Sequence, residues 1–152
     1  MPQNLAPASA PTPTPPARSL SKIRAVGIVV LAQNHCTTIA KCIAGIFAAN
    51  SYSGWHTSLW IVVVADGCTD HTAKVARGAL GAFGQVLEVS AGTWQAAHRI
   101  GATAVMEHFP DVPRHTLLLT SMDATADLPR DWIDTQLQGA QSPVGLASTH
   151  LS

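Results

Sequence analysis

The chain has 152 residues, of which 47% are hydrophobic and 12% are charged, and its nine basic residues balance nine acidic ones. This length and apolar content suit a single domain with a core, and the balanced charge excludes an electrostatic basis for binding nucleic acid or an anionic membrane. Three cysteines without a C-x-x-C spacing predict no disulfide framework and therefore a cytoplasmic protein. We also expect no transmembrane segment, because no strongly apolar stretch approaches the about 20 residues that span a bilayer.

Residues 1–21 hold six of the ten prolines, separated mainly by Ala, Ser and Thr. A segment of this composition buries little apolar surface, so we predict an extended, disordered tail. Order is expected to begin near Ile23, which leaves a single domain over residues 22–152.

Buried strands and helices alternate along the rest of the chain. The continuous β-branched run from Arg24 to Leu31 predicts a strand buried on both faces. Thr37 or Thr38 can cap the next helix, because apolar residues then recur at helical spacing up to Phe47. The elements expected after it, in chain order, are a loop at 50–57, a strand at 59–64, a helix at 72–80, a strand at 85–89, a helix through 97–108, a strand at 116–120 and a helix at 129–137.

This alternation predicts an α/β domain of Rossmann-like type, with a mainly parallel sheet in strand order 3-2-1-4 flanked by helices. Ligands of such sheets bind at the carboxyl ends of the strands. Four segments of the sequence reach that edge, namely 32–36, 65–70, 91–95 and 121–125. We therefore expect their polar side chains to converge on one crevice.

Three aspartates at these strand ends are candidates for chemistry. The carboxylate of Asp66 can accept hydrogen bonds from a nucleotide base or ribose, or it can form an Asx turn that only shapes the loop; the sequence favours neither. Asp70 precedes a helix start, where a simple N-cap is expected. Asp123 can ligate Mg²⁺ or Mn²⁺ through a hard oxygen, with a turn aspartate as the alternative.

Soft ligands and aromatic rings also lie near the strand ends. No standard zinc spacing joins the nearby thiols and imidazoles, so a zinc site is not expected at His35, Cys36, Cys68 and His71. Three tryptophans, Trp55, Trp60 and Trp94, can stack on a base or sugar. Trp60 lies inside a strand and is expected in the core, so Trp94, at the start of the third helix, is the preferred candidate.

Four segments, in this order, resemble the family-two glycosyltransferases of the GT-A fold, over about Ile23 to Trp132. The most specific match is VVVADGCTDHT at 62–72, which resembles V-V-V-D-D-G-S-T-D-G-T. The others are VVLAQNH at 29–35 beside V-V-I-P-A-x-N-E, GTWQAAHRIG at 92–101 beside G-x-x-x-A-A-R-x-x-G, and LLTSMDAT at 118–125 with PRDW at 129–132 beside L-x-x-x-D-A-D and P-P-D-W.

The resemblance implies transfer of a sugar from a nucleoside-diphosphate sugar to an unknown acceptor. It implies a donor-binding role for the residues that match the family's nucleotide site, namely Ala32, Asn34, His35, Asp66, Gly67 and His98. It also implies a Mg or Mn ion at a D-x-D motif that begins at Asp123 and ends at Thr125. The general base for the acceptor hydroxyl is expected beyond Ser152, so we expect no catalytic residue in this chain, which is then either truncated or completed by another chain or domain.

Several positions depart from the family pattern. His35 replaces an acidic residue, Ala65 the first of two aspartates, His98 an arginine, and Thr125 the second aspartate of D-x-D. A hydroxyl is a weaker magnesium ligand than a carboxylate, so only weak metal binding is expected.

Two hypotheses stay open, a glycosyltransferase donor domain and a non-catalytic nucleotide-binding or interaction module of the same fold. A dehydrogenase is least favoured, because no G-x-G-x-x-G follows the first strand.

Overall fold

A parallel β-sheet forms the centre of the protein. The computed structural model describes residues 23–54, 57–140 and 150–151, so the predicted tail at 1–21 and Trp55 lie outside the described residues. The sheet order is β3-β2-β1-β4-β5, and every neighbouring pair is parallel. The strands are β1 (Ala25–Ala32), β2 (Ser58–Asp66), β3 (Gly84–Val89), β4 (Leu117–Asp123) and β5 (His150–Leu151). The predicted α/β class and the order 3-2-1-4 are therefore confirmed, with β5 added beside β4.

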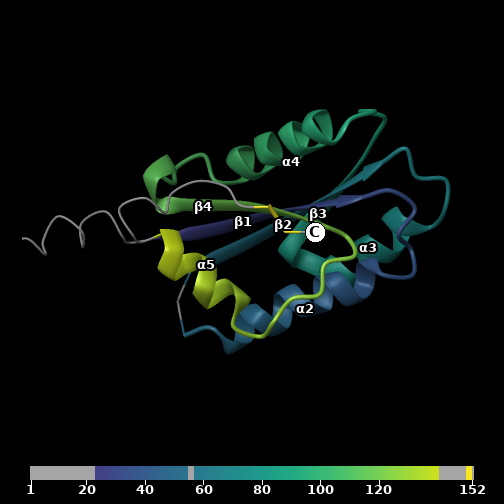
Figure 1. The fold of residues 1–152 in the computed structure, drawn as a ribbon. Helices are drawn as coiled ribbons and strands as arrows, with labels where there is room; N and C mark the ends of the chain where they lie inside the picture. The colour runs from purple at the N-terminus through teal and green to yellow at the C-terminus, as the bar shows by residue number, and fades with distance from the viewer. Residues whose placement is uncertain (1–22, 55–56, 141–149, 152) are drawn as a thin grey trace, which may run out of the picture.

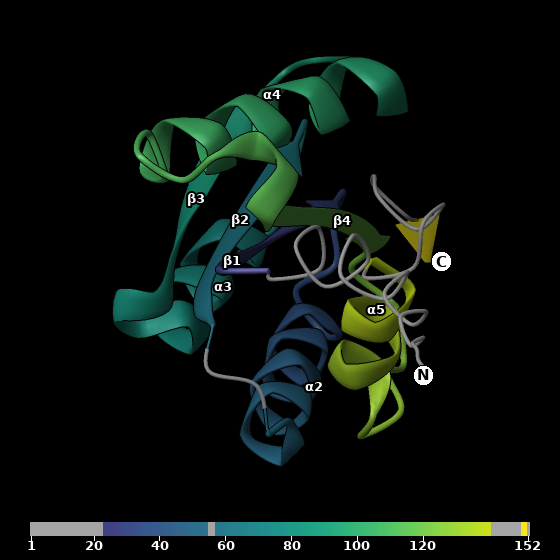
Figure 2. The ribbon, with the colours of Figure 1, turned by 90° about the vertical axis from the view of Figure 1, so that its left-hand side faces the viewer.

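Helices cover both faces of this sheet. Helix α4 lies alone on one face, and α2, α3 and α5 lie together on the other (Figures 1 and 2). No helix in the described part of the chain is long and apolar enough to cross a membrane. The helices are α2 (Ile39–Tyr52), α3 (Thr72–Leu80), α4 (Trp94–His108) and α5 (Trp132–Ala140), with short 3-10 turns η2 (Gly81–Phe83) and η3 (Arg114–Thr116).

The core has two layers because side chains of a strand alternate between its faces. In β1, Ile28 and Val30 point into the layer under α2, α3 and α5. Val29 and Leu31 point into the layer under α4. All eight residues of β1 are buried, as the uninterrupted apolar run predicts.

Several element boundaries differ from the sequence prediction, and three of these differences follow from burial or from proline. Helix α2 continues to Tyr52, into the beginning of the loop expected at 50–57, because Ala49 is buried and extends its apolar face. Strand β4 continues past Thr120 to Asp123, because its polar Thr120 and Ser121 are buried inside the sheet. Helix α5 begins at Trp132, and Pro129 lies before it, where its carbonyl accepts the N–H of Trp132 at 3.0 Å.

Two glycines allow α4 to lie close to the sheet. A Cβ added at Gly27 in β1 would collide with Val105 Cγ1 of α4, and a Cβ added at Gly101 in α4 would collide with Val29 Cγ1 of β1. Only a residue without a side chain fits at either position. This close contact fixes the start of α4 relative to the strand ends.

We expect the Gly101→Ala substitution to destabilise the fold by about 1–3 kcal/mol, because overpacking forces the helix away from the sheet. The matched control is Gly78→Ala in α3, where no atom lies within 4 Å of the added Cβ. That change should stabilise the protein by roughly 0.5–1 kcal/mol through helix propensity. Chemical denaturation of both variants measures the difference, and effects of the same sign would contradict the packing account.

Candidate functional site

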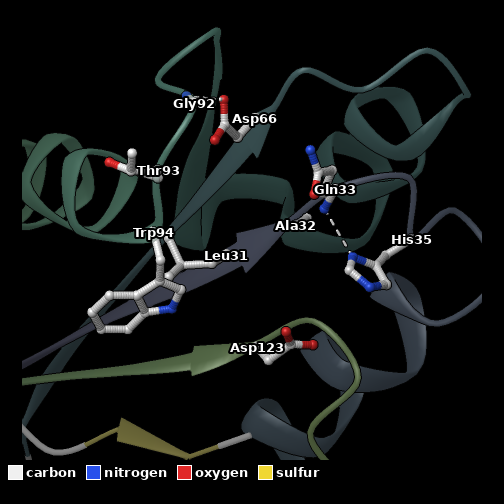
Figure 3. Close-up of a pocket in the computed structure, with 10 residues that line it drawn as sticks. Leu31, Ala32, Gln33, His35, Asp66, Gly92, Thr93, Trp94 and Asp123 are labelled. Atoms are coloured by element: carbon white, nitrogen blue, oxygen red, sulfur yellow. Dashed lines mark hydrogen bonds between the residues drawn. The ribbon is translucent and has the colours of Figure 1, made fainter.

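A cavity of about 180 Å³ lies at the carboxyl ends of the strands. Its walls come from the ends of β1, β2 and β4 and from the loop that enters α4 (Figure 3). Strand β4 lies on the opposite side of β1 from β2, so the chain reverses its direction of sheet growth here, which is where open α/β sheets bind ligands. The lining residues are Leu31, Ala32, Gln33, His35, Asp66, Gly92, Thr93, Trp94, Ala97 and Asp123.

The two carboxylate oxygens of Asp66 have different environments. Oδ1 accepts hydrogen bonds from the backbone N–H groups of Ala91, at 2.7 Å, and Gly92, at 3.4 Å. Within the described residues, Oδ2 accepts no hydrogen bond, and it points toward the side of the cavity that holds Thr93 and Trp94 (Figure 3). Asp66 therefore both shapes the β3–α4 loop and presents a charged acceptor to the cavity.

His35 also lines this cavity, and one hydrogen bond fixes which of its ring nitrogens carries the proton. Its Nδ1 accepts the backbone N–H of Gln33 at 2.8 Å, the dashed line in Figure 3. A backbone N–H can only donate, so Nδ1 carries no proton and the neutral ring holds its proton on Nε2. The backbone N–H of His35 donates to Thr72 Oγ1 at 2.8 Å, which fixes the loop against α3.

Asn34 does not line this cavity, contrary to the expectation that it shares a crevice with Asp66. Its backbone is left-handed, with φ 57°, a conformation that asparagine tolerates better than most residues. Its Oδ1 accepts the backbone N–H groups of Thr69, at 2.8 Å, and Asp70, at 3.3 Å. The Asn34 side chain therefore joins the β1–α2 loop to the β2–α3 loop.

Asp70 is not the N-cap of α3, contrary to the expectation, but its carboxylate joins two loops. Its Oδ1 accepts Thr72 N at 3.0 Å and the hydroxyl of Thr72, while its Oδ2 accepts Cys36 N at 3.2 Å. The residue directly before α3 is His71, which makes no side-chain cap. The hydrogen bond from the Thr72 hydroxyl is the main reason that the pKa of Asp70 lies far below its usual range. The Asp70 carboxylate in turn raises the pKa of the Cys36 thiol, chiefly through a hydrogen bond.

Asp123 ends β4 and faces the cavity across from Asp66 (Figure 3). Its Oδ1 accepts both the backbone N–H of Thr125, at 2.8 Å, and the Thr125 hydroxyl, at 2.7 Å. Beneath it, burial and the Asp123 charge raise the pKa of the core residue Cys42 to about 11. Thr125 thus donates to the carboxylate and adds no second charge for a metal.

The residues present fit a resident divalent cation poorly. No cluster of three or more His, Cys, Asp or Glu side chains suited to a metal occurs in the described ranges. Magnesium prefers several hard oxygen ligands in nearly octahedral geometry. Of Asp123 and Thr125, the two positions expected to bind the metal, only Asp123 provides a carboxylate. One of its oxygens already accepts two hydrogen bonds from Thr125.

Two aromatic side chains at the start of α4, Trp94 and His98, were expected at the crevice, and only one of them lines the cavity. Trp94 lines the cavity, as its place at the start of the third helix predicts, and its ring stacks on His98, with centroids 5.1 Å apart and planes at 11°. His98 itself does not line the cavity. Trp60 is partly buried and stacks on His108 at 3.6 Å, in agreement with its expected packing role.

The structure thus brings four predicted site residues together, Ala32, His35, Asp66 and Asp123. Gly67, Asn34, His98 and Thr125 lie outside the lining. Sequence reasoning missed Gln33 and Thr93, although Thr93 could have been found as the N-cap of α4, where its Oγ1 accepts Ala96 N at 3.1 Å. No known protein-family model matches the chain, and no curated protein matches its sequence.

We expect the Asp70→Asn variant to be less stable than the parent at neutral pH. A carboxylate with a depressed pKa stabilises the fold above its unfolded pKa, near about 3.9, and this contribution is lost as the pH falls toward the folded value. The difference in melting temperature between parent and variant should therefore shrink below about pH 4. A difference that stays constant down to acid pH would show that the charge of Asp70 is not what stabilises the two loops.

Proposed function

We propose that this domain binds a nucleoside-diphosphate sugar in the cavity at the strand ends, as the donor half of a glycosyltransferase of the GT-A type. The observation that carries the proposal is Asp66, whose Oδ2 faces the cavity while Oδ1 holds the loop. The cavity of about 180 Å³ is smaller than the about 300–1,000 Å³ of pockets for drug-sized ligands. It therefore suits one part of such a donor, with the rest extending toward solvent.

The polar groups of the cavity suit a nucleoside. Asp66 Oδ2 accepts a ring N–H or a ribose hydroxyl, and the Nε2–H of His35 donates to a carbonyl or phosphate oxygen. Gln33 adds a side-chain amide that both donates and accepts. A ligand that carries N–H and C=O groups side by side satisfies all three, which favours a base such as uracil.

We expect a divalent cation to contribute little to the affinity for the donor. With one carboxylate at Asp123, further ligands for Mg²⁺ or Mn²⁺ would come from the diphosphate and from water. No described residue is assigned as the general base. The role proposed for this domain is therefore limited to binding the donor.

A second candidate function is a non-catalytic nucleotide-binding or interaction module of the same fold. The hydrogen bond from Thr125 Oγ1 to Asp123 Oδ1 favours it, because that hydroxyl occupies the place of the second carboxylate. The two functions differ in one observable, since a donor domain is expected to bind the sugar diphosphate more tightly than the nucleoside diphosphate that lacks the sugar.

We expect the Asp66→Asn variant to bind uridine diphosphate about 10- to 150-fold more weakly than the parent, which corresponds to loss of a hydrogen bond to a charged group. The asparagine oxygen can still accept Ala91 N, so the loop should stay folded, while its amide presents a donor in place of an acceptor. Calorimetry measures the affinity, and the melting temperature checks the fold.

The matched control for this test is Asp111→Asn, an equal loss of charge at an exposed turn beyond the far end of α4. It should leave binding unchanged. If Asp66→Asn binds as tightly as Asp111→Asn, or if the parent itself does not bind uridine diphosphate, the carboxylate serves only the loop and the proposed site is wrong.

We expect Thr125→Asp to strengthen Mn²⁺-dependent binding of uridine diphosphate. The new carboxylate lies beside Asp123, so the two charges repel each other without a cation and attract one when the diphosphate is present. Thr125→Asn, which is similar in size and neutral, is the control. Calorimetry with and without Mn²⁺ on all three proteins decides the question, and no gain for Thr125→Asp over Thr125→Asn would exclude a metal at this loop.

A further inference from the structure

Trp94 is a large apolar side chain that remains 45% exposed at the wall of the cavity. The other two exposed large hydrophobic residues in the described ranges pack against neighbours away from it. Phe83 meets the ring of Phe47 edge-on, with centroids 5.6 Å apart, and the Tyr52 ring lies 5.7 Å from the Arg130 guanidinium. An indole left this exposed at the wall of a cavity is a feature that the fold does not require.

The Trp94 ring is held in one orientation. The His98 imidazole, one helical turn later, lies nearly parallel to it. The loop before it is anchored by Asp66 Oδ1, and Thr93 caps the helix that Trp94 begins. Asp66 therefore fixes the loop that carries the indole and also presents its second oxygen toward the indole's side of the cavity (Figure 3). The two groups form one pre-arranged surface.

We propose that Trp94 is a stacking platform for the planar base of the bound nucleotide, with His98 as the positioning residue behind it. The inference deepens the proposed function, because it assigns the base to a particular wall of the same cavity. Stacking on an aromatic ring contributes to binding of any base, whereas the hydrogen bond to Asp66 selects a base with an N–H at its edge.

The neighbours of Trp94 favour a base over a sugar at this wall. Leu31 lies beside the indole in Figure 3, and Ala97 follows one turn along α4, so the surface around the ring is apolar. A hexose can also offer a C–H face to the indole, but its hydroxyls point in every direction around the ring, including toward Leu31 and Ala97, whose side chains offer no hydrogen-bond partner. A flat base offers an apolar face to this wall and one polar edge to Asp66.

The test uses uridine, without diphosphate or metal, as the probe for the full chain. Trp94→Ala should weaken uridine binding about 5- to 150-fold, the range expected for one lost base–aromatic stack. Trp94→Phe keeps an aromatic face and should bind within about threefold of the parent. Uridine should quench the tryptophan fluorescence of the parent and leave that of Trp94→Phe nearly unchanged, although calorimetry still detects binding.

Two further comparisons complete the test. His98→Ala should also weaken uridine binding while its melting temperature stays near that of the parent, because the indole loses its fixed orientation. Methyl glucoside should neither quench the fluorescence nor compete with uridine. Equal uridine affinity in the parent and Trp94→Ala would overturn the platform, and so would the absence of saturable uridine binding to the parent at millimolar concentration.

The outcome separates the platform from the proposed function. If uridine binding depends on Trp94 but uridine-diphosphate glucose binds no more tightly than uridine, the platform stands and donor binding is wrong. If the sugar diphosphate binds tightly and depends on Asp66 but not on Trp94, donor binding stands and the platform is wrong.

Discussion

Strand β1 is buried along its whole length and is paired in parallel on both edges, and the site depends on this arrangement. Because its neighbours β2 and β4 run in the same direction, the polar residues that follow all three strands emerge at one edge of the sheet. The crevice opens beside β1 because β2 and β4 lie on opposite sides of it. Asp66 and Asp123 face each other there although 57 positions separate them in the sequence.

The same side chains stabilise the loops and line the cavity. One oxygen of Asp66 holds the β3–α4 loop and the other faces the cavity. One nitrogen of His35 accepts a backbone N–H and thereby leaves the proton on the other nitrogen. A variant that tests the proposed binding must therefore keep the loop contact and change only the atom that faces the cavity.

The apolar pattern predicted the sheet well, because a continuous run of β-branched apolar residues is typical of a parallel strand that is buried on both faces. It predicted less of the site. Asn34 lies at a strand end as expected, but its left-handed backbone turns its side chain toward Thr69. Trp94 lines the cavity, as its place at the start of the third helix predicts, but His98 lies one turn further along α4 and only stacks on the indole. The polar Ser121 does not read as part of a buried strand in the sequence. In the structure its side chain is buried in the sheet, so β4 continues past the predicted end at Thr120.

A crystal structure of the protein with saturating uridine diphosphate would test nucleotide binding at the strand ends most directly. We expect the nucleotide in the cavity, with the base against Trp94 and its ring N–H within hydrogen-bonding distance of Asp66 Oδ2. The Asp66 Oδ1 bond to Ala91 should remain. A nucleotide bound at any other surface, or an unaltered cavity at saturating nucleotide, would contradict it.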